Sequence, residues 1–167
     1  MSYARDLLFG DGHIPAIKRI VGPTLLDIAP LDVDRKQATD LIVMRGLDTT
    51  IACRVRRPGY AESFPWEFTV RYRRDSGAQT EHEKFSRGWA HRFFYGHSNG
   101  DNDFARWLLL DLNAWRYHTN FHAPFLRPER KSNGDGTHFL AYDVRNFPAD
   151  PQLVVASSHP VPVNTPT

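Results

Sequence analysis

The sequence has one cysteine in 167 residues, and its apolar stretches are only a few residues long. A single cysteine, Cys53, excludes an internal disulfide framework and any zinc site built from several cysteines. A membrane-spanning helix needs a run of ~20 apolar residues, which is not present. The first residues also lack the apolar run of a signal peptide. These absences lead us to expect a soluble, cytoplasmic protein that has no membrane partner.

The composition nevertheless supplies a hydrophobic core. Hydrophobic residues make up 41% of the chain and charged residues 24%, which is typical of globular proteins and argues against general disorder. The length suits one domain. We therefore expect a single α/β domain over residues 1–158. The proline-rich residues 159–167 are expected to form an extended or disordered tail.

Apolar and polar residues alternate in a way that predicts three successive strands, over residues 39–44, 50–57 and 67–74. Their order favours a three-strand meander in a mixed sheet flanked by helices, which is an α/β (α+β) fold. Cys53 alternates with Ile51 and Val55, so its side chain is expected in the core.

Helical patterns flank the predicted meander. Thr80 and Glu83 form the capping-box pattern that begins a helix. An apolar stripe predicts a long helix over residues 104–117. Further expectations are a helix over 13–28 broken at Gly22-Pro23, short strands over 93–96, 137–144 and 152–156, and a loop over 128–136.

The charge is unevenly distributed although the net charge is only +2. Residues 51–74 contain six arginines against two acids, Glu62 and Glu67; the arginines are Arg54, Arg56, Arg57, Arg71, Arg73 and Arg74. Arginine is preferred where phosphate or carboxylate is held in a fixed geometry. If the strands are neighbours in a meander, four of these guanidinium groups share one face of the sheet. They then need anions, either carboxylates such as Glu67, Glu81 and Glu83 or the backbone of a nucleic acid.

The order helix, meander, helix, strand resembles the core of the PD-(D/E)xK nucleases. That resemblance implies a Mg²⁺-dependent DNA endonuclease or phosphodiesterase, in which hard oxygen ligands hold the metal. Asp40, at the start of the first predicted strand, matches the first acid of the family, and Arg56 stands where the family has its catalytic lysine. Shorter similarities, through the segments IACRVRR, FTVRYRRDSGAQTE and FFYGH, are to small uncharacterised proteins of phages and mobile elements.

The sequence departs from the nuclease motif at one position, because Arg54 replaces the glutamate that would bind the metal. Glu67 on the next strand is the candidate for the missing carboxylate, so that Asp40 and Glu67 would be the Mg²⁺ ligands and Arg56 the catalytic cation. The other acids that could contribute are Asp48, Asp27 and Asp11.

Three functions remain open on these residues. The first is the metal-dependent nuclease. The second is a catalytically inactive module that binds nucleic acid, or a host protein with an acidic, DNA-like surface, as an accessory or anti-defence protein would. The third is a structural factor whose arginines are paired internally. The direction in which the arginines point distinguishes the three.

The histidine and aromatic residues give weaker evidence of function than the arginines. His82, His91 and His97 are close in sequence, but their spacing matches no metal-binding signature. The tryptophans on predicted helices are expected in the core; they are Trp89, Trp107 and Trp115. Tyr60, Phe64 and Trp66, in the segment between the second and third strands, either face a nucleic acid as a lid or cover an edge of the sheet.

Overall fold

The computed structural model of the protein describes residues 3–28, 41–43 and 50–162. The chain divides into two compact units, Met1–Thr49 and Thr50–Thr167. Helices and strands occur together, which confirms the mixed α and β class. The single domain over residues 1–158 and the tail over 159–167 stay predictions. No helix in the described ranges has the length and apolar character needed to cross a membrane.

The first unit begins with helices and ends in a small sheet. Helix α1 (Tyr3–Gly12) is followed by α2 (Ile14–Val21) and the 3-10 turn η1 (Gly22–Leu25). Strand β1 (Leu26–Ile28) pairs antiparallel with β2 (Leu41–Val43). The break predicted at Gly22-Pro23 is confirmed, because α2 ends at Val21. Proline cannot donate the next helical hydrogen bond, which accounts for the break.

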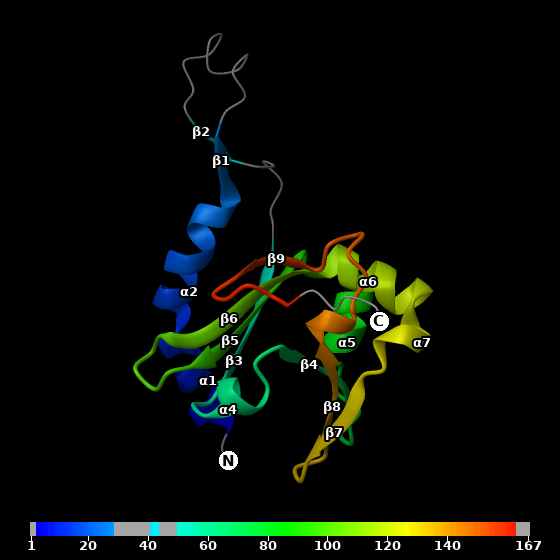
Figure 1. The fold of residues 1–167 in the computed structure, drawn as a ribbon. Helices are drawn as coiled ribbons and strands as arrows, with labels where there is room; N and C mark the ends of the chain where they lie inside the picture. The colour runs from blue at the N-terminus through cyan, green and yellow to red at the C-terminus, as the bar shows by residue number, and fades with distance from the viewer. Residues whose placement is uncertain (1–2, 29–40, 44–49, 163–167) are drawn as a thin grey trace. The chain divides into compact units, whose positions relative to one another are not determined.

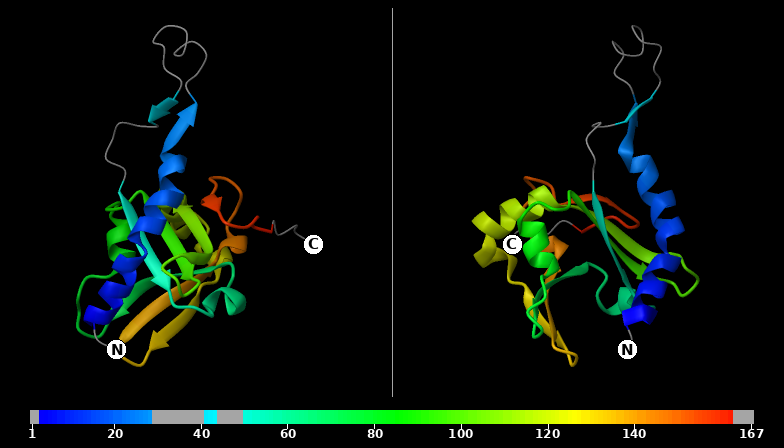
Figure 2. Two further views of the ribbon diagram at one scale, coloured as in Figure 1. Left: turned by 90° about the vertical axis from the view of Figure 1, so that its left-hand side faces the viewer. Right: turned by 180° about the vertical axis from the view of Figure 1, so that it is seen from behind.

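The second unit contains two sheets (Figures 1 and 2). The first has the order β3-β5-β6-β9, formed by Ile51–Arg56, Arg92–Ser98, Phe104–Asp111 and Val154–Ser157. The second has the order β4-β8-β7, formed by Glu67–Arg74, Thr137–Asp143 and Glu129–Asn133. Only the β3–β5 pair is parallel among these ladders. The helical segments are α4 (Tyr60–Ser63), α5 (Glu81–Ser86), α6 (Leu112–Phe121), α7 (Ala123–Leu126) and η2 (Val144–Asn146).

The core of the second unit is rich in aromatic rings. Phe68 of β4 stacks on Tyr142 of β8 at 5.3 Å between ring centroids and meets Phe93 of β5 edge-on. Trp115 of α6 and Phe85 of α5 are buried in the same cluster. The two sheets therefore share one core with α5 and α6, and the strands that carry the arginines are fixed at its border.

The predicted meander is wrong. Strand β3 pairs in parallel with β5, and β4 pairs antiparallel with β8, so β3 and β4 belong to different sheets. The cause is β5, which is buried from its second residue onward and needs neighbours on both edges. Strands β3 and β6 supply those edges. The segment between β3 and β4 contains Gly59, at a φ of 90°, and the short helix α4, and it carries the chain to the second sheet.

The helix predicted over residues 104–117 is also wrong in its first half. Residues Phe104–Asp111 form β6, and α6 begins only at Leu112. Asp111 is the N-cap, and its Oδ1 accepts the backbone N–H groups of Asn113 at 2.7 Å and Ala114 at 3.1 Å. A short apolar run buried on both faces has no periodicity that separates strand from helix.

Of the smaller predictions, some are confirmed and others are wrong. The capping box is confirmed: Thr80 N–H donates to Glu83 at 2.8 Å, and the Thr80 hydroxyl accepts from Glu83 N–H at 3.3 Å. The strand at 137–144 is confirmed as β8, but the predicted loop at 128–136 contains β7. Cys53 and Trp89, both expected in the core, are exposed.

Candidate nucleic-acid interface

One face of the first sheet changes from apolar to basic along β3. Three cross-strand rows follow one another on this face: Ala52, Phe93 and Leu110; then Arg54, Tyr95 and Leu108; then Arg56, His97 and Arg106. The apolar members of the first two rows belong to the core or pack against it. The third row has no apolar side chain. Neighbouring strands are ~4.8 Å apart, so two guanidinium groups and an imidazole extend from adjacent strands at the end of the core face.

Arg54 is held inside the protein. Its guanidinium donates to Thr69 Oγ1 at 3.1 Å and to Glu81 Oε2 at 2.5 Å, and its side chain is only 11% exposed. The same carboxylate oxygen accepts the backbone N–H of Arg71 at 3.1 Å. Glu81 therefore joins β3, β4 and α5, which gives Arg54 a structural role. Burial is the largest cause that lowers the pKa of Arg71, and the positive charge of Arg54 adds to it.

Arg56 and Arg106 are held by aromatic rings instead of carboxylates. The guanidinium of Arg56 lies 4.2 Å from the ring centroid of Tyr60, and that of Arg106 lies 4.3 Å from that of Trp66. No carboxylate in the described part of the chain lies within ion-pair distance of either. Nη1 of Arg106 is buried and has no hydrogen-bond partner among the described residues. These two cations keep donor capacity for an anion.

His97 lies between these two arginines on the central strand of the row. It is 1% exposed, and neither ring nitrogen has a hydrogen-bond partner in the described ranges. Burial, and then the positive charges of Arg56 and Arg106, lower the pKa of His97 to about 4. The imidazole is therefore neutral at pH 7. A buried polar group without partners is costly, which marks this histidine as unusual in the fold.

Lys131 of β7 extends the basic surface onto the second sheet. Its Nζ donates to Glu67 Oε1 at 2.8 Å and to Oε2 at 2.6 Å. The same ammonium lies 4.1 Å from the ring centroid of Phe64. Both oxygens of Glu67 are thus bonded to one lysine, and that lysine was not among the predicted site residues.

This ion pair bears directly on the predicted Mg²⁺ site. Glu67, proposed as a metal ligand, is occupied by Lys131, and no three His, Cys, Asp or Glu side chains of the described ranges form a group that could hold a metal. Asp40 and Asp48 lie outside the described residues. The described residues thus do not fit a magnesium site around Glu67, and the catalytic roles of Asp40, Glu67 and Arg56 stay predictions.

The segment between β3 and β4 covers the basic surface with aromatic rings. Tyr60 and Phe64 are each 38% exposed, and their ring centroids are 6.3 Å apart. Tyr60, Phe64 and Trp66 each meet a cation from a different strand, β3, β7 and β6 respectively. We call the whole set the arginine–aromatic face: Arg54, Arg56, Arg71, Arg106, Lys131, Tyr60, Phe64 and Trp66.

The structure brings together only some of the predicted nucleic-acid contacts. Arg54 and Arg71 lie on different sheets, yet their guanidinium groups are 5.0 and 5.6 Å from the ring centroid of Phe139. Arg73 pairs with Asp75 at 3.1 Å, and both side chains are exposed. Arg57 is exposed just beyond β3, and Arg74 is half-buried at the end of β4.

Sequence reasoning missed Arg106, His97 and Lys131. The sequence patterns predict a helix at Arg106 and a loop at Lys131. No alternation along this segment marks Arg106, because a register shift at His97/Ser98 places Phe104 against Phe94 on the opposite face of the sheet. For His97 the sequence raises only a metal-binding role, which no spacing supports.

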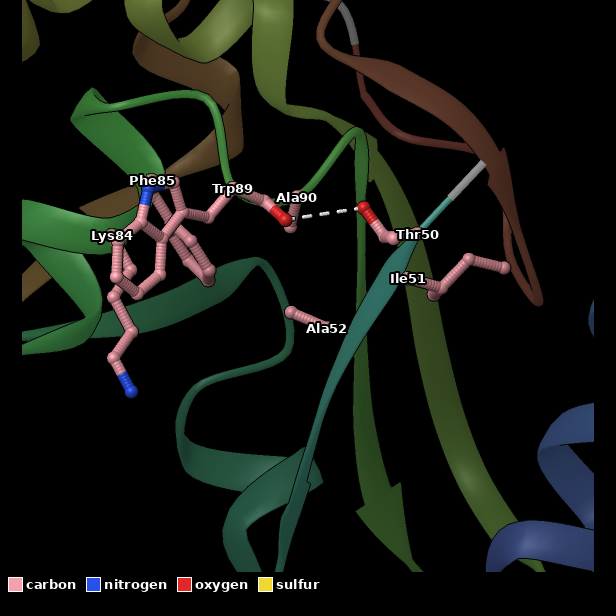
Figure 3. Close-up of a pocket in the computed structure, with 7 residues that line it drawn as sticks. All are labelled: Thr50, Ile51, Ala52, Lys84, Phe85, Trp89 and Ala90. Carbon is pink, nitrogen blue, oxygen red and sulfur yellow. Dashed lines mark hydrogen bonds between the residues drawn. The ribbon is translucent and has the colours of Figure 1, made fainter. Parts of the chain in front are cut away.

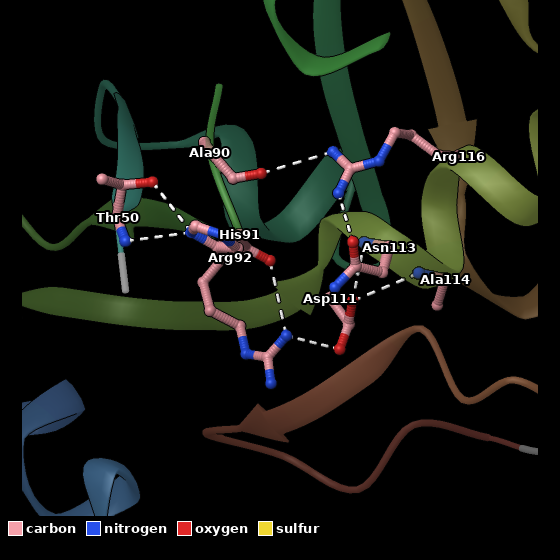
Figure 4. Close-up of polar contacts among 8 residues, drawn as sticks. All are labelled: Thr50, Ala90, His91, Arg92, Asp111, Asn113, Ala114 and Arg116. Atoms are coloured by element: carbon pink, nitrogen blue, oxygen red, sulfur yellow. Dashed lines mark hydrogen bonds and ion pairs between the residues drawn. The ribbon is translucent and has the colours of Figure 1, made fainter. Parts of the chain in front are cut away.

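Other arginines of the second unit show what internal pairing looks like (Figure 4). Arg92 pairs with the carboxylate of Asp111. Arg116 donates to the carbonyl oxygen of Ala90 at 3.3 Å and to the side chain of Asn113. It also donates to the carbonyl oxygen of Phe85 at 2.8 Å. These side chains tie α5, α6 and β5 together. In the described ranges, Arg56 and Arg106 have no such acceptors.

A separate hollow lies at the beginning of β3 (Figure 3). It has a volume of about 260 Å³ and is lined mainly by apolar atoms of Ile51, Ala52, Phe85, Trp89 and Ala90, with Thr50 and Lys84 at its border. The Thr50 hydroxyl donates to the carbonyl oxygen of Trp89 at 3.2 Å across it. Since Arg56 is at the other end of β3, this hollow is not part of the arginine–aromatic face.

No protein-family model matches the chain, and neither a curated protein nor a solved structure does.

Proposed function

We propose that this protein binds nucleic acid through the arginine–aromatic face, with single strands preferred. The observation that carries the proposal is the pairing of Arg56 and Arg106 with aromatic rings instead of acids. The face has five cations, and the carboxylates of the described residues that contact them are Glu67, Glu81 and Glu129. The face therefore has a net charge of +2.

The two kinds of side chain suit the two parts of a nucleotide. Guanidinium and ammonium groups bind the phosphate backbone and release its counterions, which gives affinity with little sequence information. Partly exposed rings such as Tyr60 and Phe64 offer surfaces on which bases stack. Bases are free to stack in this way only in single strands, which is the reason for the stated preference.

The test measures binding of fluorescently labelled oligonucleotides by anisotropy, with single-stranded and duplex forms over a series of salt concentrations. We expect affinity for single strands to fall steeply as salt rises, with a log–log slope of about −0.7 for each neutralised phosphate. The double variant Arg56→Gln/Arg106→Gln should weaken binding and reduce that slope by about 1.4, if each arginine contacts one phosphate.

The matched control is Arg87→Gln/Arg130→Gln, which removes the same charge elsewhere. Arg87 ends α5, and Arg130 is on the opposite side of β7 from Lys131 because side chains alternate along a strand. Equal loss in both double variants, or binding that does not respond to salt, would contradict the proposal. The same mixtures with Mg²⁺ or EDTA test the nuclease: cleavage that needs metal and disappears in Asp40→Asn would assign that activity.

A further inference from the structure

We propose that Arg56, His97 and Arg106 form a binding site for one terminal phosphate monoester, and that His97 takes up a proton when the phosphate binds. The inference rests on the proposed nucleic-acid binding and adds the chemical group that is recognised. The three side chains occupy one cross-strand row on β3, β5 and β6.

The first argument is that buried nitrogen atoms of the third row lack hydrogen-bond partners. Both ring nitrogens of His97 and Nη1 of Arg106 are buried and have no hydrogen-bond partner in the described part of the chain. Buried polar groups in folded proteins are nearly always bonded. The Arg92 and Arg116 side chains of the same unit follow that rule, as does Arg54. Single unpartnered nitrogens also occur in Arg71, Trp115 and His118, but among the described residues His97 alone has two, and Arg106 lies beside it. The third row therefore has room for an acceptor that the described residues do not supply.

The second argument is charge. The groups that face His97 are Arg56 from β3, Arg106 from β6 and the ring of Tyr95 on its own strand, 5.5 Å away between ring centroids. The Tyr95 hydroxyl is bonded to Thr69 at 3.1 Å, so it does not serve the histidine. Among the described residues, the charges that shift the pKa of His97 are those of Arg56 and Arg106, with no carboxylate beside them. An anion between the two arginines removes the repulsion that keeps the imidazole neutral.

The third argument is the number of oxygens. A terminal phosphate has three non-bridging oxygens and a charge near −2, whereas a backbone phosphodiester has two and a charge of −1. Three donors on three adjacent strands match the terminal group. The proton that His97 gains comes from the buffer, and the imidazolium then donates a charge-assisted hydrogen bond to one phosphate oxygen.

The first measurement uses inorganic phosphate alone as the probe. Imidazole ¹⁵N resonances are followed from pH 4 to 8, with and without saturating phosphate. We expect His97 to titrate near pH 4 without phosphate and at a clearly higher pH with it. Calorimetry at pH 6 in buffers of different ionisation enthalpy should show that a proton is taken up, and the uptake should vanish in His97→Gln.

The second measurement compares one oligonucleotide carrying a 5′-phosphate, a 3′-phosphate or only hydroxyl ends. We expect a phosphorylated end to tighten binding about tenfold, since a charge-assisted hydrogen bond supplies that much. The gain should be lost in His97→Gln and kept in His91→Gln, whose histidine lies just before the same strand at its opposite end. If His97→Gln does not fold, Arg106→Lys provides the same comparison, because lysine keeps the charge but loses the planar fork.

The outcomes separate the two proposals. Phosphate binding with a shift at His97 but no oligonucleotide binding overturns the proposed function and leaves the phosphate site. Oligonucleotide binding that is indifferent to terminal phosphate and to His97→Gln overturns the phosphate site and leaves the proposed function. A His97 titration that phosphate does not move also overturns the site.

Discussion

Removal of the Glu81 carboxylate tests whether Arg54 is structural. The Arg54 side chain is 11% exposed and that of Glu81 is 25% exposed, with 2.5 Å between the paired atoms. In Glu81→Ala the guanidinium stays buried with only Thr69 as a partner, and the backbone N–H of Arg71 also loses its acceptor. Breaking a buried pair costs ~3–5 kcal/mol. Since water partly reaches Glu81, we expect a loss of about 2–4 kcal/mol in the free energy of unfolding.

The assay is urea unfolding at pH 7, followed by tryptophan fluorescence and circular dichroism. A loss of this size lowers Tm by about 10 °C in a chain of this length. The control is Arg73→Ala, which breaks an exposed pair with Asp75 and should cost no more than ~0.5 kcal/mol.

A double-mutant cycle with Arg54→Met completes the test. The double variant should be less destabilised than the sum of the two single variants, because it leaves no unpaired buried charge. If Glu81→Ala and Arg73→Ala cost the same, Arg54 is not structurally paired in solution and joins the residues available to an anion.

Three further predictions concern stability. The pKa of His97 is about 4 in the folded protein and about 6.5 in the unfolded chain, so the free energy of unfolding is highest above about pH 6.5 and falls as the pH is lowered toward 4. By linkage this fall is about 3 kcal/mol. It should be absent when His97→Gln is unfolded in urea over the same pH range. In Gly96→Ala the new Cβ would lie 2.3 Å from the ring of Phe104, so we expect ~1–3 kcal/mol of destabilisation in thermal unfolding, and an unchanged Tm would refute the packing described. Asp111→Ala removes the N-cap of α6 and the partner of Arg92, and should cost about 1–3 kcal/mol by the same assay; a loss below ~0.5 kcal/mol would contradict both contacts.

Local signals in this sequence predicted local structure well. The capping box at Thr80, the break at Gly22-Pro23 and the presence of strands at β3 and β4 depend on neighbours within a few residues, and all are found in the structure. The predicted alternation is not found, because Phe68, Thr69 and Val70 are all buried and Cys53 is exposed. Strand pairing depends on residues far apart in the chain. The meander prediction assumed that consecutive strands pair, but the strand buried on both faces, β5, pairs with both β3 and β6.

The contrast between local and long-range contacts also explains which residues of the site the sequence predicts. Six arginines within 24 residues indicated a basic surface, and three of them, Arg54, Arg56 and Arg71, belong to it. Their partners come from elsewhere: Glu81 from α5, Arg106 from β6 and Lys131 from β7. No spacing rule links these positions, because their contact is set by the packing of two sheets.

Arginine count alone does not separate a binding surface from a stabilising network, but the partners do. The guanidinium groups of Arg54, Arg92 and Arg116 donate hydrogen bonds to carboxylate, amide or carbonyl oxygens and so connect helices and strands of the fold. The guanidinium groups of Arg56 and Arg106 lie over aromatic rings, beside the buried neutral side chain of His97. A ring attracts a cation through its face but accepts none of the five guanidinium hydrogen bonds in the plane of the fork. An anion can therefore bind these two arginines without displacing a hydrogen-bonded partner from the described part of the chain. Binding at Arg54 would first have to break the ion pair with Glu81, which is why we place the phosphate at the third row and not at the second.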